Sequence, residues 1–283
     1  GNYQAGDVLT FTVNASEALQ TGALAPRLAL DVGGVTRYAT YVSGSGTSAL
    51  VFQYIVQAGD NDSDGIAVSS LDLRGQTLTD LAGNDLNLAL NGVGSTAGVH
   101  VDTTAPGASS IVRLDASPNN ASSVRFSVTF SEAVSGVDAS DFNLIFGGSA
   151  AGSISSVTSL DGRTYTVLVD GLSGQGSLRL DLAGSGTGIV DAAGNAVSGG
   201  LTGASYSIDR VAPSVVSVQV PANGTYVAGQ NLDFIVNTDE AVLLDTSTGT
   251  PRLQVTLDNG VTAYANYLSG AGSTALVFRL TVV

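Results

Sequence analysis

The sequence has 283 residues, of which 43% are hydrophobic and 12% charged, and this composition predicts folded domains with apolar cores. The formal net charge of −14 argues against nucleic acid as a partner and favours cations. Cysteine is absent, which excludes disulfides and thiolate metal sites, and no apolar run reaches the roughly 18 residues of a membrane span, so we expect no membrane contact here.

Short runs of alternating hydrophobic residues recur along the chain, separated by clusters of Gly, Ser, Asn and Asp. Residues 9–13 are one such run and residues 124–130 are another. Alternation with a period of two, broken by frequent turn residues, predicts half-buried antiparallel strands. Because no segment sustains the 3.6-residue period of a helix, we expect an all-β fold with the strand count of a sandwich, about seven per hundred residues.

The beginning and the end of the chain repeat one another. Residues 3–13 (YQAGDVLTFTV) align with residues 226–236 (YVAGQNLDFIV), and residues 38–44 align with residues 264–270. Similarity at a fixed offset over separate segments indicates one structural unit used twice.

The middle of the chain keeps part of the same pattern. Residues 124–133 (VRFSVTFSEA) align with residues 9–18 (LTFTVNASEA), and residues 191–195 (DAAGN) align with residues 80–84 (DLAGN). The order of units is therefore type one, type two, type one.

A short polar segment ending in proline joins the units. Residues 101–106 (VDTTAP) return as residues 208–213 (IDRVAP), and the two prolines are 107 residues apart, about the length of one immunoglobulin-like domain. We therefore predict tandem immunoglobulin-like β-sandwiches, two near-complete units plus a truncated third, divided as 1–102 (lacking its N-terminal strand), 103–209, and 210–283 (lacking its C-terminal part).

Glutamate is rare and regularly placed. The chain has three, Glu17, Glu132 and Glu240, and each follows the equivalent strand of its unit and precedes an alanine. Duplication can copy any residue, but carboxylates are the natural ligands of hard cations. We therefore favour a repeated ligand role for these positions.

Residues 60–65 (DNDSDG) resemble the first half of a calcium loop, with carboxylates Asp60, Asp62 and Asp64 at alternate positions before a glycine. The twelfth position is Leu71, so this is not an EF-hand. The alternative is a plain turn rich in Asx residues. Three carboxylates so close repel one another, and the loop itself contains no arginine to offset them.

Sandwich topology predicts that these carboxylates meet. Successive strands run between opposite ends of a sandwich, which places the loop of residues 60–65 at the C-terminal end of the first unit and Glu132 and Asp191 at the N-terminal end of the second. The linker adds Asp102 between them. The first joint is thus predicted to be a Ca²⁺ site formed by Asp60, Asp62, Asp64, Asp102, Glu132 and Asp191.

The second joint offers fewer ligands. It has Asp209 and Glu240 but no counterpart of the loop with three aspartates. We expect it to bind Ca²⁺ more weakly, or not at all.

An enzymatic function is not expected. His100 is the single histidine and lies between two valines of a predicted last strand, where a solvent-facing or edge position is the simplest interpretation. The sequence offers no Ser-His-Asp set, phosphate-binding glycine loop or histidine metal site. The carboxylates that glycoside hydrolysis would need map to the joints between domains, which are not clefts.

The linker with Asp-Thr-Thr-Ala-Pro (102–106), the Ser-Glu-Ala segments and the Asp-x-Ala-Gly-Asn turns together resemble the bacterial immunoglobulin-like repeats of large surface adhesins. The resemblance implies an extracellular, cell-surface or secreted extender, rigidified by calcium, whose partners are neighbouring repeats of the same chain; it does not indicate the host or matrix ligand of the parent adhesin. The alternatives are an adhesion module that binds a glycan or protein through exposed tyrosines, and an accessory module of a secreted hydrolase.

Overall fold

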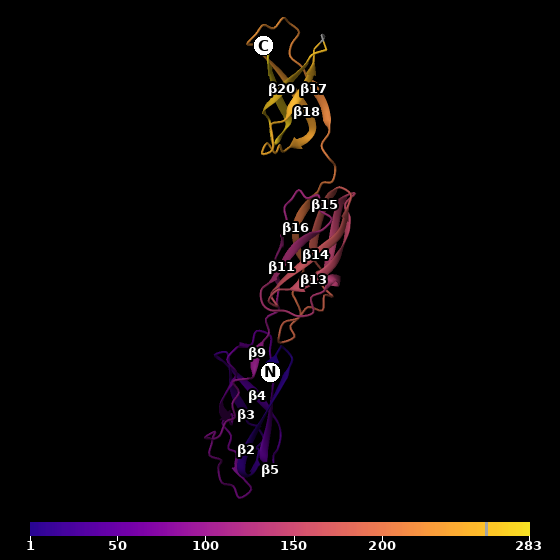
Figure 1. The fold of residues 1–283 in the computed structure, drawn as a ribbon. Coiled ribbons are helices and arrows are strands. Elements are labelled where there is room, and N and C mark those ends of the chain that lie inside the picture. The colour runs from indigo at the N-terminus through magenta and orange to yellow at the C-terminus, as the bar shows by residue number, and fades with distance from the viewer. Residues whose placement is uncertain (258–259) are drawn as a thin grey trace. The chain divides into compact units, whose positions relative to one another are not determined.

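The computed structural model describes residues 1–257 and 260–283, and it confirms the all-β prediction (Figure 1). Among these residues the one helical element is a single 3₁₀ turn, η1 (Ala139–Asp141). Contacts between residues divide the chain into two compact units, Gly1–Asp209 and Arg210–Val283. In the described ranges, no helix is long and apolar enough to cross a membrane.

Residues 1–102 form two sheets around one hydrophobic core. The larger sheet has six strands in the spatial order β7 (Ala67–Asp72), β3 (Arg27–Val32), β4 (Val35–Ser43), β5 (Thr47–Ile55), β2 (Val8–Gln20) and β8 (Thr79–Asp80). In the smaller sheet, the central strand β9 (His100–Asp102) pairs with β1 (Asn2–Tyr3) in parallel and with β6 (Asn61–Asp62) antiparallel. Leu30, Leu50 and Phe52 are fully buried in the core.

Residues 103–209 form a second sandwich with a core of its own. One sheet has the order β10 (Ala108–Arg113), β11 (Val124–Phe130), β14 (Thr164–Ser173) and β13 (Ala151–Ser159), and the other has the order β12 (Phe142–Gly148), β15 (Gly176–Leu182) and β16 (Leu201–Ile208). Alternate residues of β11 are buried, among them Phe126, Val128 and Phe130 at 0% exposure. This is the alternation that the sequence predicts for a strand with one face in a core.

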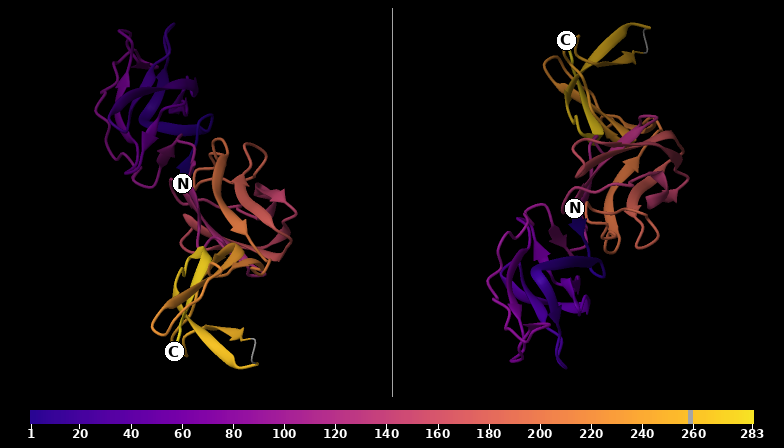
Figure 2. Two further views of the ribbon diagram at one scale, coloured as in Figure 1. Left: turned by 90° about the horizontal axis from the view of Figure 1, so that it is seen from above. Right: turned by 90° about the horizontal axis from the view of Figure 1, so that it is seen from below.

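Residues 210–283 contain one sheet among the positions that the structure describes. Its five strands, orange to yellow in Figure 2, have the order β17 (Val215–Gln219), β18 (Asn231–Val242), β21 (Ser273–Thr281), β20 (Thr262–Ser269) and β19 (Arg252–Thr256). Its packing repeats that of the first sandwich: the ring centroids of Tyr267 and Phe278 lie 5.9 Å apart, edge to face, as do those of Tyr41 and Phe52. The sequence repeat thus corresponds to a repeated cross-strand contact.

The buried face of β11 yields a stability prediction. Phe126→Ala removes a fully buried ring and should lower the free energy of unfolding of the second sandwich by about 3–5 kcal/mol, because the lost apolar contacts leave a cavity. Leu160→Ala, at a position 68% exposed, should change it by less than about 0.5 kcal/mol. Hydrogen exchange of the β14 amides reports on this sandwich; equal effects of the two variants would contradict the assigned core.

Candidate metal centre

The two Asp-x-Ala-Gly-Asn segments fold as the same closed turn. Asp191 Oδ1 accepts hydrogen bonds from the backbone N–H groups of the second, third and fourth residues after it, at 2.8, 2.8 and 2.9 Å, and Asn195 Nδ2 donates to Asp191 Oδ2 at 2.8 Å. Asp80 accepts from the second and fourth residues after it at 2.8 Å and from Asn84 Nδ2 at 2.7 Å. The aspartate therefore organises the turn, and the turn holds the carboxylate in place.

The linker after β9 is fastened to the second sandwich through this turn. Asn195 Nδ2 also donates to the backbone carbonyl of Asp102 at 2.9 Å. On the other side, the N–H of Thr103 donates to Asn61 Oδ1 at 2.9 Å, and the N–H of Thr104 donates to Asp102 Oδ1 at 2.9 Å. These bonds fix the backbone that follows Asp102, and the last of them also holds the Asp102 side chain.

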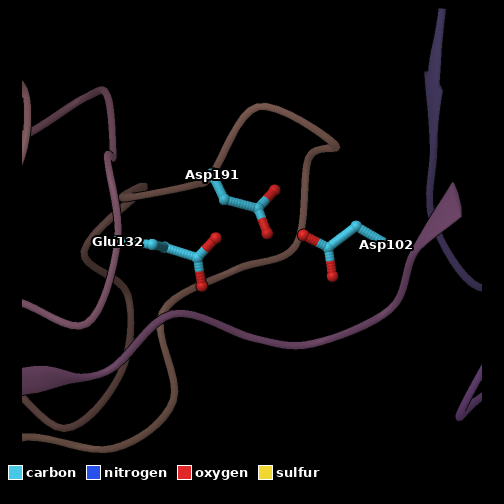
Figure 3. Close-up of side chains that lie close together, drawn as sticks. All are labelled: Asp102, Glu132 and Asp191. Atoms are coloured by element: carbon cyan, nitrogen blue, oxygen red, sulfur yellow. The ribbon is translucent and has the colours of Figure 1, made fainter. Parts of the chain in front are cut away.

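Three carboxylates meet at the place that the linker reaches. One oxygen from each of Asp102, Glu132 and Asp191 lies within 4.8 Å of the others, and Figure 3 shows the three groups turned toward a common space. They come from the end of β9, the turn after β11 and the closed turn described above. Asp191 is buried and the other two are half-buried. The sequence predicted this meeting for these three residues.

The charges of the group act on one another. Burial raises the pKa of Glu132 above its ordinary value, and the negative charges of Asp102 and Asp191 raise it further. A carboxyl whose pKa is higher in the folded state favours folding in its protonated form, and that contribution is lost as the pH rises through the folded pKa. At neutral pH the group is therefore electrostatically unfavourable without a positive charge near it.

The donor set fits a hard divalent cation. All three groups present carboxylate oxygens, which such cations prefer. Asp191 Oδ2 accepts one hydrogen bond from Asn195, and a carboxylate oxygen can accept more than one interaction, so the turn does not use up its capacity. Burial, and after it the charges of Asp102 and Asp191, raises the pKa of Glu132, and a cation at this point would offset the contribution of the two charges.

The first sandwich carries a related arrangement of side chains. Glu17, Asp80 and Asn84 line one cavity of about 450 Å³. Their counterparts in the second sandwich are Glu132, Asp191 and Asn195, so the sequence repeat brings equivalent side chains together in both sandwiches.

Asp60, a predicted ligand, has different partners from those expected. Its carboxylate forms a salt bridge with Arg37 of β4 at 2.7 Å and accepts hydrogen bonds from the hydroxyl of Tyr54 and from the N–H of Gln57. Burial opposes its ionisation, but the bonds from Tyr54, Gln57 and Arg37 hold its pKa below the ordinary value. Burial, with the hydrogen bond to Asp60, raises the pKa of Tyr54 to about 12.

The loop itself contains no arginine, but Arg37 reaches its carboxylate Asp60 from a strand 23 residues earlier in the chain. Asp60 is not among the three carboxylates that the fold brings together. Neither Arg37 nor Tyr54 was identified from the sequence. Arg37 lies in β4 and Tyr54 lies in β5, and each strand has an alternating pattern. This pattern does not show which loop either side chain contacts.

Asp62 also holds the loop together. Its carboxylate accepts hydrogen bonds from the backbone N–H groups of Gly33 at 2.7 Å and Gly65 at 2.8 Å. Gly33 has a φ of +58°, and a Cβ there would lie 1.9 Å from the carbonyl oxygen of Asn61, so the close approach requires glycine. The loop lies beside the linker, as the topology predicted, because Asn61 pairs with Asp102. The two buried carboxylates of this loop, Asp60 and Asp62, accept hydrogen bonds from the backbone of the first sandwich. This agrees with the alternative interpretation of the segment as a turn rich in Asx residues.

The other predicted ligands and the histidine lie as follows. Asp64 is exposed, and Asp209 accepts a hydrogen bond from Gln175 Nε2 at 3.0 Å. Glu240 lies in β18 of the other compact unit, so its ligand role stays a prediction. His100 lies in the central strand of the smaller sheet, so it is not an edge residue, and its half-buried ring contacts Asn2 Oδ1 and the carbonyl of Ala97.

The second sandwich matches a known protein family. Residues 102–208 match the family model of the bacterial Ig-like domain. The match starts at the linker aspartate and ends with β16, and it confirms for this part of the chain the resemblance to bacterial immunoglobulin-like repeats. A comparison with curated proteins gave no match.

Two solved structures are similar at a distance. One is of the Escherichia coli adhesin FdeC, with 13% identity and a TM-score of 0.40 over 99% of this chain and 84% of that chain. The other is of a marsupial T cell receptor, with 11% identity and a TM-score of 0.22 over 100% of this chain and 90% of that chain. Structural similarity at this level does not indicate the function of this chain.

The network around Asp60 yields a second prediction. Asp60→Asn should lower the free energy of unfolding of the first sandwich by about 2 kcal/mol at neutral pH, because Arg37 loses its charged partner. Since the folded pKa of Asp60 is depressed, its contribution exists above the unfolded pKa, about 3.9, and is lost as the pH falls through the folded value. The deficit of the variant should therefore shrink on acidification.

Asp64→Asn is the matched control, since it makes the same change at an exposed position of the same loop. Urea denaturation followed by exchange of the β5 amides measures both variants. An unchanged stability of Asp60→Asn, or an equal loss in the control, would show that the network does not stabilise the loop.

Proposed function

We propose that this chain is an extender segment of a large bacterial surface or secreted adhesin, in which immunoglobulin-like sandwiches follow one another and calcium stiffens a joint. The carboxylate group of Asp102, Glu132 and Asp191 carries the proposal. The match of residues 102–208 to a bacterial Ig-like domain supports the bacterial and extracellular setting. In this setting the partners are neighbouring repeats of the same chain.

Calcium is the cation that the site suits best. The three carboxylates supply hard, negatively charged oxygens, and calcium accepts 6 to 8 oxygens in flexible geometry, so water and neighbouring groups can complete the shell. A bound Ca²⁺ supplies the positive charge that the group lacks. Asp60 and Asp62 are engaged in the loop, and exposed Asp64 lies outside the group of three carboxylates.

Stiffening follows from where the ligands originate. Asp102 belongs to the last strand of the first sandwich, while Glu132 and Asp191 belong to the second. Two carboxylates 4.8 Å apart repel by roughly 3–4 kcal/mol at an effective dielectric of 20, which favours movement of the linker away from the turn. A cation bound by all three carboxylates replaces this repulsion with attraction to the ion. It thereby ties the linker to the second sandwich.

The tyrosines favour an extender over a glycan-binding module. The hydroxyl of Tyr41 accepts a hydrogen bond from the N–H of Ser45 at 2.7 Å, and that of Tyr267 accepts one from Ala271 at 2.7 Å. Their rings pack edge to face on neighbouring phenylalanines. Both tyrosines thus serve a repeated turn and strand contact.

Isothermal titration with calcium tests the proposal. After thorough chelation, the chain should bind Ca²⁺ with a dissociation constant no weaker than about 10⁻³ M, and Glu132→Gln should weaken binding at least about tenfold because one charged ligand is lost. Binding should strengthen as the pH rises through the raised pKa of Glu132, since protons compete for this carboxylate.

Asp64→Asn is the control and should bind as the unchanged chain does. A flat titration of the unchanged chain would overturn the calcium proposal. If Glu132→Gln and Asp64→Asn weakened calcium binding equally, the result would indicate that the loop of residues 60–65 contributes to the site.

A further inference from the structure

The closed turn of the second sandwich contacts the first sandwich at more than the linker. The Nδ2 group of Asn2, in β1, donates a hydrogen bond to the backbone carbonyl of Ala192 at 3.3 Å. Ala192 is the second residue of the Asp-x-Ala-Gly-Asn turn that begins at Asp191. The turn is therefore bonded to β1 as well as to the linker after β9, which Asn195 reaches.

Gly194 lets the first sandwich approach this turn closely. Its φ is +97°, in the left-handed region, and a Cβ at this position would lie 3.2 Å from Nε2 of Gln4. The side chain of Gln4 thus lies against the bare backbone of the turn. Gly83 has the equivalent position in the first sandwich and a φ of +92°, but a Cβ there would have nothing within 4 Å. The conformation of the turn is common to both sandwiches, whereas the contact with Gln4 belongs to the joint.

The two amide side chains that contact the turn are carried by fixed backbone. Asn2 pairs with His100 in the smaller sheet, and its Oδ1 lies 3.3 Å from Nδ1 of that histidine. The backbone N–H of Gln4 donates to Asp7 Oδ2 at 2.9 Å, which closes a short turn after β1. The first sandwich therefore presents both amides from positions that its own hydrogen bonds determine.

The two closed turns differ in how far their last residue is covered. Asn195 is 9% exposed, whereas Asn84 is exposed, although each donates the same hydrogen bond to the aspartate of its own turn. Asn195 also donates to the backbone carbonyl of Asp102. The internal bonds of the turn therefore do not bury this amide, and its contact with the end of the first sandwich does.

None of these contacts includes a carboxylate. The groups that take part are neutral amides and backbone atoms, whose interactions do not require a positive charge nearby. They border the carboxylate group all the same, because one cavity of about 570 Å³ is lined by Asn2 and Ala192 together with Asp102 and Glu132. The joint thus has a neutral set of contacts beside a charged one.

We propose that the closed turn of residues 191–195 is a docking element for the sandwich before it, and that it holds the first sandwich in one orientation without a metal ion. Asn2, Gln4 and the linker carbonyl contact three different residues of the turn. Three separate points fix an orientation, whereas one bond to the linker would leave rotation free. The partner that this surface fits is an immunoglobulin-like sandwich that presents amide side chains from its first strand beside the linker.

Hydrogen exchange of the Asn195 side-chain amide, measured by NMR on the full chain in chelator, tests the proposal. Docking should make this exchange at least about tenfold slower than that of Asn84, which has the equivalent position in the other closed turn. Asn2→Ala combined with Gln4→Ala should speed the exchange of Asn195 at least about threefold and leave that of Asn84 unchanged, because two of the three docking contacts are lost. Equally fast exchange of the two amides in the unchanged chain, or no effect of the double variant, would overturn the proposal.

Asn14→Ala combined with Gln20→Ala is the matched control, since it makes the same two changes at exposed positions of β2. It should leave the exchange of Asn195 unchanged, and equal acceleration by the two double variants would refute the role of Asn2 and Gln4. Backbone amide exchange in β14 shows that the second sandwich stays folded in each variant. Because every measurement is made in chelator, a failure of docking is observed separately from a failure of calcium binding.

Discussion

Three carboxylates confined to one small volume are the constraint on which the first joint depends. The closed turn fixes Asp191, and the amide of Asn195 ties the same turn to the backbone of Asp102. Glu132 enters the group from the turn after β11 and has its pKa raised by burial and by the other two charges. These hydrogen bonds hold the groups together while the charges repel one another, and in the proposed function a bound cation removes the repulsion.

Repetition explains how much could be predicted from the sequence. The alternation of residues 124–130 indicated β11, and the repeated Asp-x-Ala-Gly-Asn and Ser-Glu-Ala segments placed Glu132 and Asp191 at one end of their sandwich. The loop of residues 60–65 could not be resolved in this way. Whether Asp60 faces a metal or an arginine depends on Arg37, whose position is set by a long-range strand pairing that local spacing does not encode.

The same repeats show which strand pairings the units share. β10 pairs with β11, and β17 pairs with β18, at equivalent positions of their sheets. The closed turn is likewise shared by the first and second sandwiches, at Asp80 and Asp191.

The distance between spin labels on the two sandwiches tests the central claim most directly. The chain has no cysteine, so Thr36→Cys and Ser156→Cys at exposed positions give two labelling sites. The account predicts a narrow distance distribution in calcium, a broader one in chelator, and a broad one in both conditions when Glu132→Gln is added. A distribution of the same width with and without calcium would contradict the claim that the ion stiffens this joint.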